Sequence, residues 1–346
     1  MKRFLIPIVA FASGLIAVSL ILAFSAGNPG VAIQSFFTRP FSSWWYIGNT
    51  LNMAGLLILA ATGSSLALRG GTFNLGGEAQ IYASALVTAI VLSGPAGPAG
   101  EAALGHGALP TLAIFATALA AAAFTGALLA FIPGILKAGI YCSELLSSFL
   151  LSAAIVPVVD YLIAGPFRDR TGNLIATEAI GKAFRLSPLL RPSVFNVSFF
   201  IAIGLAILAA IILKKTREGY RFTVSGTAPN FALFAGFPVG SVTVTSMTLS
   251  GLFHGLTGFF AITGTWYMCH QSLSAGMGWS ALAVALIARS NLIAVIPAAI
   301  LYAWLDTASD MAFLSSNSGF DSTSIVQAII LLVVSARFLP LRRAPK

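Results

Sequence analysis

The chain has 346 residues, of which 58% are hydrophobic and only 8% are charged, and its mean hydropathy is +0.93. A soluble domain is about 45–50% apolar and about 25% charged, so this composition excludes a soluble globular protein and requires lipid as part of the solvent. The net charge of +9 is attributed to Lys and Arg that orient membrane spans, and nucleic-acid binding is not expected.

The length limits the number of membrane spans. A helix needs about 20 residues to cross about 30 Å of hydrocarbon, so the chain accommodates roughly eight to ten spans and little else. We therefore expect one all-α, polytopic membrane domain over residues 1–346, with about eight full spans plus a short helix pair. Both termini are expected in the cytoplasm, and the expected location is the cell (inner) membrane.

The N-terminus resembles a signal peptide, with a basic start, an apolar run and small residues near Ser25 and Ala26. The apolar run of about 20 residues is long for a signal sequence and suits a membrane span. We therefore expect an uncleaved first span over about 4–26.

Four further apolar runs follow in the first half of the chain. They are expected as spans at about 47–67, 79–93, 109–132 and 143–164. Pro133 and Gly134 are expected to end the span at 109–132, because proline breaks a helix interior. Trp44, Trp45 and Tyr46 are expected as an interfacial aromatic belt.

The most unusual membrane-proximal stretch is GGTFNLGGEAQ, residues 70–80. Its four glycines break the helix, and Asn74, Glu78 and Gln80 supply polar groups. One interpretation is an unwound segment that lines a polar cavity, with these three side chains pointing inward. The other is a plain cytoplasmic turn with Glu78 in solvent. The stretch has no Gly-Lys-Ser/Thr ending, so it does not match a phosphate-binding loop.

Glu144 opens the span at 143–164 in the sequence YCSELLSSFLLSAA. A carboxylate at a helix N-terminus is favourable with the helix dipole by about 0.3–1 kcal/mol, which explains the charge without a function. The alternative is a place on the substrate pathway. Ser147, Ser148 and Ser152 follow at helical spacing and indicate a face that meets something polar.

After a polar external loop at 165–195, spans are expected at about 196–213 and 242–264. His254 lies within the second of these spans, between Gly251 and Gly255. The small-xxx-small pair favours a tight helix crossing with His254 hydrogen-bonded to a neighbour, and the alternative is a ligand contact. Proton coupling through His254 is not favoured, because no chain of intramembrane carboxylates accompanies it.

Between these two spans lies a polar loop at 214–237, expected on the cytoplasmic side. Five charged residues crowd its first eight positions. The stretch 227–236 that follows is short and amphipathic. The charged part is interpreted as an orientation signal, and the mostly apolar part as the functional one.

The C-terminal part begins with two short apolar runs, 279–288 and 292–305. They are expected either as two thin, tilted spans or as a helix pair that enters the membrane and returns. Asp306, Asp310 and Asp321 are expected outside, and a last span is expected at about 323–338.

The charge distribution supports this topology. It places 12 of the 19 Lys and Arg residues on the cytoplasmic side and six outside, five of them in the 165–195 loop, and leaves Arg289 unassigned. Short loops obey the positive-inside rule, whereas long loops weigh less.

Candidate groups for catalysis or metal binding are sparse. Cys142 and Cys269 form no metal pattern and are expected as ordinary thiols, and His106 and His270, in expected external loops, make no metal set with His254. No nucleophile–base arrangement stands out, so an enzyme is not expected.

Four blocks in the same order resemble one family. LALRGGTFNLGGEAQ resembles the "FN(I/L)G.EGQ" segment of membrane permeases of ABC importers, in the ribose and branched-chain-amino-acid superfamily. The block at 141–169 resembles "NEVISTLMLNYIA…GP" of the nucleoside-type branch, with Glu144 at a matching position. VSGTAPNFALFAGF resembles its coupling-loop block, and GWSALAVALIARSN resembles "GFIALAVALLGRWNP". The resemblance covers about residues 47–306.

The sequence departs from the family pattern in places. Thr227 and Phe231 stand where the family often has an acidic and a basic residue, and Ser290 stands where it often has Trp. These departures leave the transporter interpretation intact and leave the substrate open.

The resemblance implies a permease subunit that moves a small solute into the cytoplasm, most simply a nucleoside, with riboflavin or a simple sugar as alternatives. It implies three partners: a cytoplasmic ABC ATPase, which hydrolyses ATP so that this chain needs no cofactor, an extracytoplasmic solute-binding protein, and a second permease subunit, a paralogue in preference to a second copy. It implies that 227–236 is a coupling helix that lies in a cleft of the ATPase, and the ATPase-coupling residues it implies are Thr227, Asn230, Phe231, Phe234 and Gly236.

Two further classes remain as alternatives. An ion-coupled secondary transporter would work alone, driven through His254, Glu78 or Glu144. An intramembrane enzyme or scaffold would need a catalytic pair that one sequence does not reveal. The substrate-pathway residues expected for a transporter are Asn74, Glu78, Gln80, Glu144 and His254.

Overall fold

The structure is a computed structural model that describes residues 19–20, 28–93 and 108–316. Apart from residues 19–20, the expected span at 4–26 lies outside these residues. The expected span at 323–338, both termini, His106 and Asp321 lie outside them as well. The first part of the described chain contains α2 (Pro29–Thr38), η1 (Arg39–Phe41), α3 (Trp44–Arg69), α4 (Gly77–Ser93), α6 (Ala108–Ile140) and α7 (Glu144–Ala164). The second part contains η2 (Lys182–Phe184), α8 (Ser198–Lys215), α9 (Arg217–Thr227), α10 (Pro229–Phe234), α11 (Val239–Ala261), η3 (Ile262–Trp266), α12 (Met277–Ile287) and α13 (Val295–Ser316).

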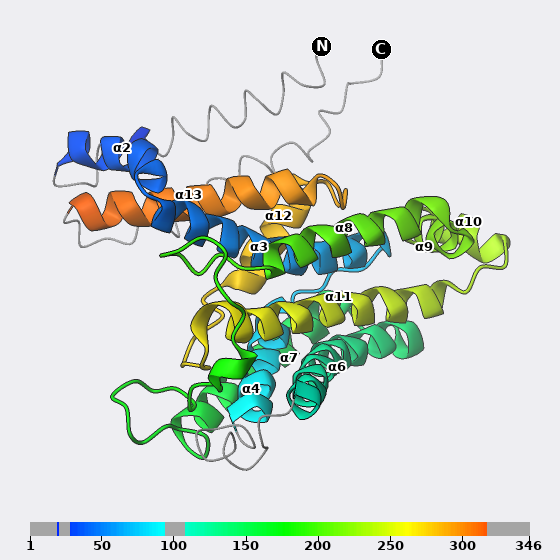
Figure 1. The fold of residues 1–346 in the computed structure, drawn as a ribbon. Coiled ribbons are helices and arrows are strands. Elements are labelled where there is room, and N and C mark those ends of the chain that lie inside the picture. Colours follow the sequence, from blue (N-terminus) through cyan, green and yellow to red (C-terminus); the bar gives the residue numbers. More distant parts are fainter. Residues whose placement is uncertain (1–18, 21–27, 94–107, 317–346) are drawn as a thin grey trace.

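The described residues form an all-helical bundle without named strands, as the sequence predicts (Figure 1). Within them, five helices are long and apolar enough to cross a membrane: Trp44–Arg69, Thr111–Ile140, Glu144–Ala164, Ser198–Lys215 and Leu292–Ala312. α4 and α12 are shorter apolar helices. The count of about eight full spans remains a prediction.

α11 is the central helix and packs on α3, α4 and α6 (Figure 1). The small-xxx-small pair makes its close approach to α6 possible. A Cβ placed on Gly126 of α6 would collide with the carbonyl oxygen of Gly251 and come within 2.7 Å of the amide nitrogen of Gly255. The predicted tight crossing is therefore confirmed, because only glycine allows the two backbones to meet here.

The expected end of a span at Pro133 and Gly134 is wrong, because α6 continues to Ile140. Gly134 instead marks a helix contact: a Cβ at this position would lie 3.1 Å from the Cβ of Met247 and 3.3 Å from the Cα of Val244. Packing against α11 holds this part of α6 in place and offsets the lost hydrogen bond and the steric clash that Pro133 brings to the helix interior.

The 214–237 loop contains two helices, not one amphipathic stretch over 227–236. Thr216 caps α9 by accepting a hydrogen bond from the amide of Gly219 at 3.0 Å. Pro229 begins α10 because its fixed φ and missing N–H suit the first helical position. Thr227 therefore belongs to the end of α9, and Gly236, with φ of +74°, follows α10.

The C-terminal pair is unequal. α12 has 11 residues, whereas α13 has 22 and is long enough to cross the membrane alone. Asp306 and Asp310 lie inside α13, and their expected place on the outer side of the membrane remains a prediction. The helix continues past them because its opposite face remains apolar: Ala308 and Ala312 are buried against Ala32 and Phe36 of α2.

The 165–195 loop has little regular structure and lies at the opposite end of the bundle from α9 and α10 (Figure 1). Backbone hydrogen bonds tie it to the connection between η3 and α12. The amide of Thr177 donates to the carbonyl of Cys269 at 2.9 Å, and the amide of Ile180 donates to that of Tyr267 at 2.8 Å.

Candidate functional site

Three of the five predicted pathway residues meet in one buried polar network, which consists of Asn74, Gln80, His254, Ser64 and Ser250. The Asn74 amide nitrogen donates to the Gln80 carbonyl oxygen at 2.8 Å and to the Ser250 hydroxyl at 3.0 Å. In return, the Gln80 amide nitrogen donates to the Asn74 oxygen at 3.0 Å. All five residues are buried.

His254 links this network to α3. Its Nδ1 lies 2.7 Å from the Gln80 carbonyl oxygen, and its Nε2 lies 3.2 Å from the Ser64 hydroxyl. An amide oxygen only accepts hydrogen bonds, so Nδ1 carries the ring proton and Nε2 is available to the Ser64 hydroxyl. The prediction that His254 bonds a neighbour at a helix crossing is confirmed.

The network forms because residues 72–76 leave the helix between α3 and α4. Two serines of α7 satisfy amides of this region: Ser148 accepts from Leu75 at 3.1 Å, and Ser152 accepts from Ala79 at 3.2 Å. The predicted polar face of α7 is therefore real at these two positions, whereas Ser147 is half-buried and donates to the carbonyl of Ser143 in its own helix end at 3.0 Å. With Asn74 and Gln80 buried, the stretch is not a solvated turn.

Glu78 does not join the network. Its two carboxylate oxygens accept hydrogen bonds from the amides of Gly276 and Gly278, at 2.8 and 2.9 Å. These amides lie at the start of α12, where the helix has no side-chain cap of its own. A carboxylate at this end satisfies unpaired donors and complements the helix dipole. Glu78 therefore joins α4 to α12.

Glu144 is paired with Lys137, whose Nζ lies 2.6 Å from its Oε1. The side chains are 10% and 30% exposed, respectively, so the pair is largely buried. The same Nζ donates to the carbonyl of Gly71 at 3.3 Å. The predicted helix-terminal carboxylate is present, and it is also one half of an ion pair beside the 70–80 stretch.

Several residues of these sites were not anticipated from the sequence. Ser64 and Ser250 resemble ordinary small residues of apolar helices, and only their polarity within long apolar runs distinguishes them. Lys137 was interpreted only as a topological charge. A second buried amide pair, in which Asn196 donates to Asn52 at 2.9 Å, was also missed.

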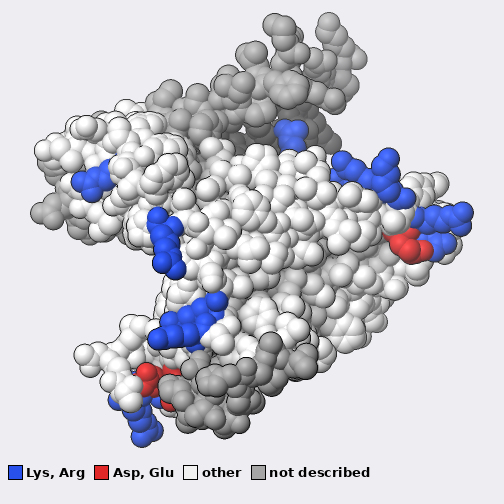
Figure 2. Space-filling view, in the orientation of Figure 1, with Lys and Arg blue, Asp and Glu red and all other residues white. Residues whose placement is uncertain are grey.

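The predicted coupling residues lie on an exposed projection at one end of the bundle. Phe234 is 95% exposed and Phe231 is 59% exposed, and Leu233 between them, not anticipated, is exposed as well. Thr227, Asn230 and Gly236 are also exposed. Figure 2 shows Lys and Arg gathered at this end of the molecule, where α8 leads into α9. An exposed apolar tip next to a cluster of basic residues is typical of a surface that binds another protein.

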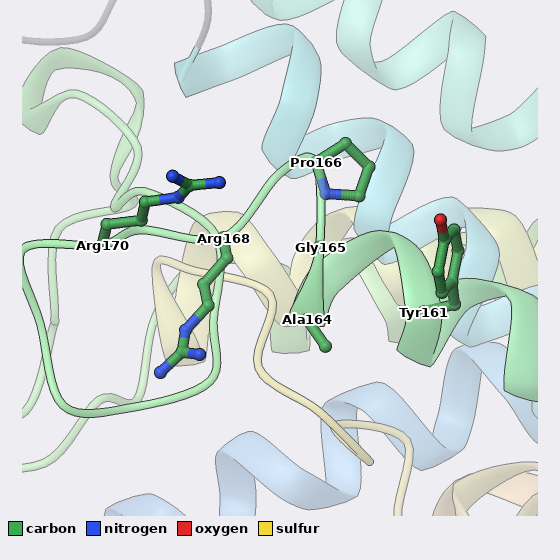
Figure 3. Close-up of a pocket in the computed structure, with 6 residues that line it drawn as sticks. All are labelled: Tyr161, Ala164, Gly165, Pro166, Arg168 and Arg170. Atoms are coloured by element: carbon green, nitrogen blue, oxygen red, sulfur yellow. The ribbon is translucent and has the colours of Figure 1, made fainter.

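An open pocket of about 610 Å³ lies at the far end of α7 (Figure 3). Its lining residues are Tyr161, Ala164, Gly165, Pro166, Arg168 and Arg170. Neither arginine forms an ion pair within the described residues. The intervening Asp169 accepts hydrogen bonds from the amide and hydroxyl of Thr171, which hold the pKa of its carboxyl below the usual range. The pocket is therefore suited to an anion.

Comparison with known proteins agrees with this architecture. The sequence model of the family described as "Branched-chain amino acid transport system / permease component" matches residues 46–335. The chain is 38% identical to the "Probable riboflavin import permease protein" of Treponema pallidum (strain Nichols), over 98% of this chain and 87% of that protein. It is 28% identical to the guanosine ABC transporter permease protein of Bacillus subtilis (strain 168), over 98% and 94%. It is 27% identical to a glucose ABC transporter permease protein of Haloferax volcanii, over 88% and 80%.

Proposed function

The chain belongs to the branched-chain amino acid transport system permease family, and on this basis we propose that it imports a heterocycle bearing a ribityl or ribosyl group. It is a membrane permease of an ABC transporter, and its family is one of transport proteins, not of enzymes. The resemblance to nucleoside-type and riboflavin permeases is confirmed. We propose that the membrane in which it works is the cell (inner) membrane.

The proposed substrate is riboflavin, with a nucleoside as the second candidate. The sequence pattern alone favours a nucleoside. The observation that reverses this order is the 38% identity to a riboflavin permease protein over nearly the whole chain, against 28% for a guanosine permease protein. Both solutes combine an aromatic heterocycle with a hydroxylated chain or ring, so both need amide partners beside apolar surface.

The polar network is proposed as the part of the pathway that meets the solute. In the structure, the side-chain amides of Asn74 and Gln80 bond to one another, to a serine and to His254, so they offer few free donors to a ligand. Recognition then requires α11 to separate from residues 72–76 during the transport cycle. Glu78 and Glu144 are proposed to support this region without touching the solute, because backbone amides and Lys137 occupy their carboxylates.

The exposed face of α10 is proposed as the binding surface for the ATPase subunit, here called the ATPase seat. Burying aromatic side chains such as Phe231 and Phe234 contributes a few kcal/mol to association. ATP binding would draw two such seats together and move the membrane helices between inward-facing and outward-facing arrangements. The second permease subunit, a paralogue or another copy, would carry the second seat.

The pocket at Arg168 and Arg170 is proposed as a contact for the extracytoplasmic solute-binding protein. The pocket lies at the end of the bundle opposite the α10 seat. Its two guanidinium groups suit carboxylates on a partner, and exposed charges of this kind mainly accelerate association and fix its orientation.

Uptake into proteoliposomes tests the function. The permease, its ATPase and its binding protein are reconstituted, and uptake of labelled riboflavin and labelled guanosine is compared. We expect ATP-dependent riboflavin uptake that unlabelled riboflavin suppresses and that guanosine and glucose do not. Preferred uptake of guanosine would replace riboflavin by a nucleoside. Uptake by this chain alone, without ATP, would instead support an ion-coupled secondary transporter.

A further inference from the structure

The backbone of α9 touches the backbone of the turn that follows α3, here called the 69–72 turn. A Cβ on Gly226 of α9 would collide with the carbonyl oxygen of Arg69 and lie 2.7 Å from the amide nitrogen of Gly71. From the other side, a Cβ on Gly71 would lie 2.9 Å from the Cα of Gly226. No side chain separates the two segments, so α9 cannot move toward the 69–72 turn without displacing the turn.

The 69–72 turn is also held by three other parts of the bundle. Side-chain hydrogen bonds join Lys137 to the Gly71 carbonyl at 3.3 Å, Arg69 to the Ser290 carbonyl at 2.8 Å, and Thr72 to the Ser246 hydroxyl at 3.0 Å. These partners lie on α6, in the connection between α12 and α13, and on α11. A displacement of the turn therefore acts on several helices together.

The two ends of this contact lead directly to the two proposed sites. On one side, Ala228 alone separates α9 from α10, whose aromatic tip is the proposed ATPase seat. On the other side, only one residue lies between Thr72 and Asn74 of the polar network. α9 also packs closely against α8, because a Cβ on Gly219 of α9 would lie 2.5 Å from the Cα of Leu213 in α8.

We propose that the contact between Gly226 and the 69–72 turn transmits movement of α10 to the polar network, which makes Gly226 a positioning residue for transport. This inference rests on the proposed function. A backbone contact transmits displacement well, because it contains no rotatable side chain that absorbs the movement. An added methyl group at Gly226 pushes the turn away from α9 and disturbs this transmission.

The test measures how many solute molecules are imported for each ATP hydrolysed in the reconstituted transporter. For Gly226→Ala we expect this ratio to fall about tenfold, within the range of couplings between distant sites. The amount of ATPase that co-purifies with the permease should stay at the wild-type level, because α10 is unchanged. A merely structural lesion would lower the amounts of both proteins in the membrane and leave the ratio intact.

Gly204→Ala in α8 and Gly139→Ala in α6 are the matched controls, because a Cβ at either position meets no atom within 4 Å. Both should keep the wild-type ratio. If Gly226→Ala does not reach the membrane, Phe222→Leu replaces it. Phe222 is buried on α9, and the tip of its ring lies 3.2 Å from a Cβ placed on Gly70. Replacing the ring by the smaller leucine should lower the ratio of imported solute to hydrolysed ATP, because it removes this contact between α9 and the turn.

A wild-type ratio in a properly inserted Gly226→Ala or Phe222→Leu protein would overturn the inference and leave the proposed function standing. Failure of the wild-type protein to import either solute with ATP would contradict the proposed function itself. The two failures are therefore distinguishable within one experiment.

Discussion

The side-chain oxygen of Gln80 lies 2.7 Å from Nδ1 of His254, although 174 residues separate the two in the chain. This contact joins α4 to α11, and the contact of the same ring with Ser64 adds α3. Three helices thus share one set of buried hydrogen bonds that none of them completes alone. Such a network is costly to disrupt in part, because each group left without a partner remains buried.

Replacing Gln80 by Leu should destabilise the protein by about 1–3 kcal/mol, because Asn74 and His254 both lose a buried partner. Denaturant-induced unfolding in detergent measures the loss. Gln271→Leu is the control, since Gln271 is exposed, and a surface change of this kind stays within about 0.5 kcal/mol. Equal effects at the two positions would show that the network adds nothing to stability.

Replacing Lys137 by Met should cost about 1–3 kcal/mol, because it leaves the largely buried Glu144 carboxylate without its cation. The double variant Lys137→Met, Glu144→Gln should recover part of this loss, since the remaining group is neutral. Unfolding of the four proteins of this double-mutant cycle gives the interaction energy. Strictly additive losses would mean that the pair does not interact in the folded protein.

Replacing Glu78 by Ala should free the amides of Gly276 and Gly278 at the start of α12. We expect faster amide hydrogen exchange in peptides covering residues 274–280, because loss of a charged cap weakens a helix end by about 1 kcal/mol. Exchange in α8 serves as the internal control. Unchanged exchange at 274–280 would contradict the assignment of Glu78 as the cap of α12.

The double substitution Phe231→Asp, Phe234→Asp should abolish both uptake and co-purification of the ATPase while the permease remains in the membrane. Both side chains are exposed, so the fold should tolerate the change. Leu189→Asp places one such negative charge on an exposed apolar residue of the 165–195 loop and should leave ATPase co-purification unaltered. Retained ATPase binding in the double variant would rule out α10 as its seat.

The substitution Arg168→Gln, Arg170→Gln should slow association with the solute-binding protein about tenfold at low salt, with a smaller effect on dissociation. Surface plasmon resonance at two salt concentrations separates the two rates. Arg191→Gln, on an exposed arginine of the same loop outside the pocket, is the control. An equal effect at Arg191 would indicate general charge attraction and not a specific contact.

The sequence predicts well those features that depend on local chemistry. α3 ends at Arg69 and α7 begins at Glu144, close to the expected bounds, because charged residues mark the ends of apolar runs. The pairing of Asn74 with Gln80 lies within one short stretch, and its glycines indicate the missing helix. Pro229 in turn shows in retrospect why the 227–236 stretch is divided.

Features that depend on distant partners were missed for a physical reason. α6 continues beyond Pro133 because Gly134 packs against Val244 and Met247, about 110 residues away in the chain. Glu78 caps α12 across 198 residues, and no local pattern predicts which helix end a carboxylate will reach. Helix propensity and hydropathy carry no information on such contacts.

The almost fully exposed ring of Phe234 affects how long permease without its ATPase would persist in the cell. A permease made without its ATPase would present this ring and its neighbours to chaperones and proteases, which recognise exposed apolar segments. Unassembled copies would then be removed, while assembled copies would be protected. The surface proposed to receive the ATPase would thus also match the amount of permease to the amount of its partner.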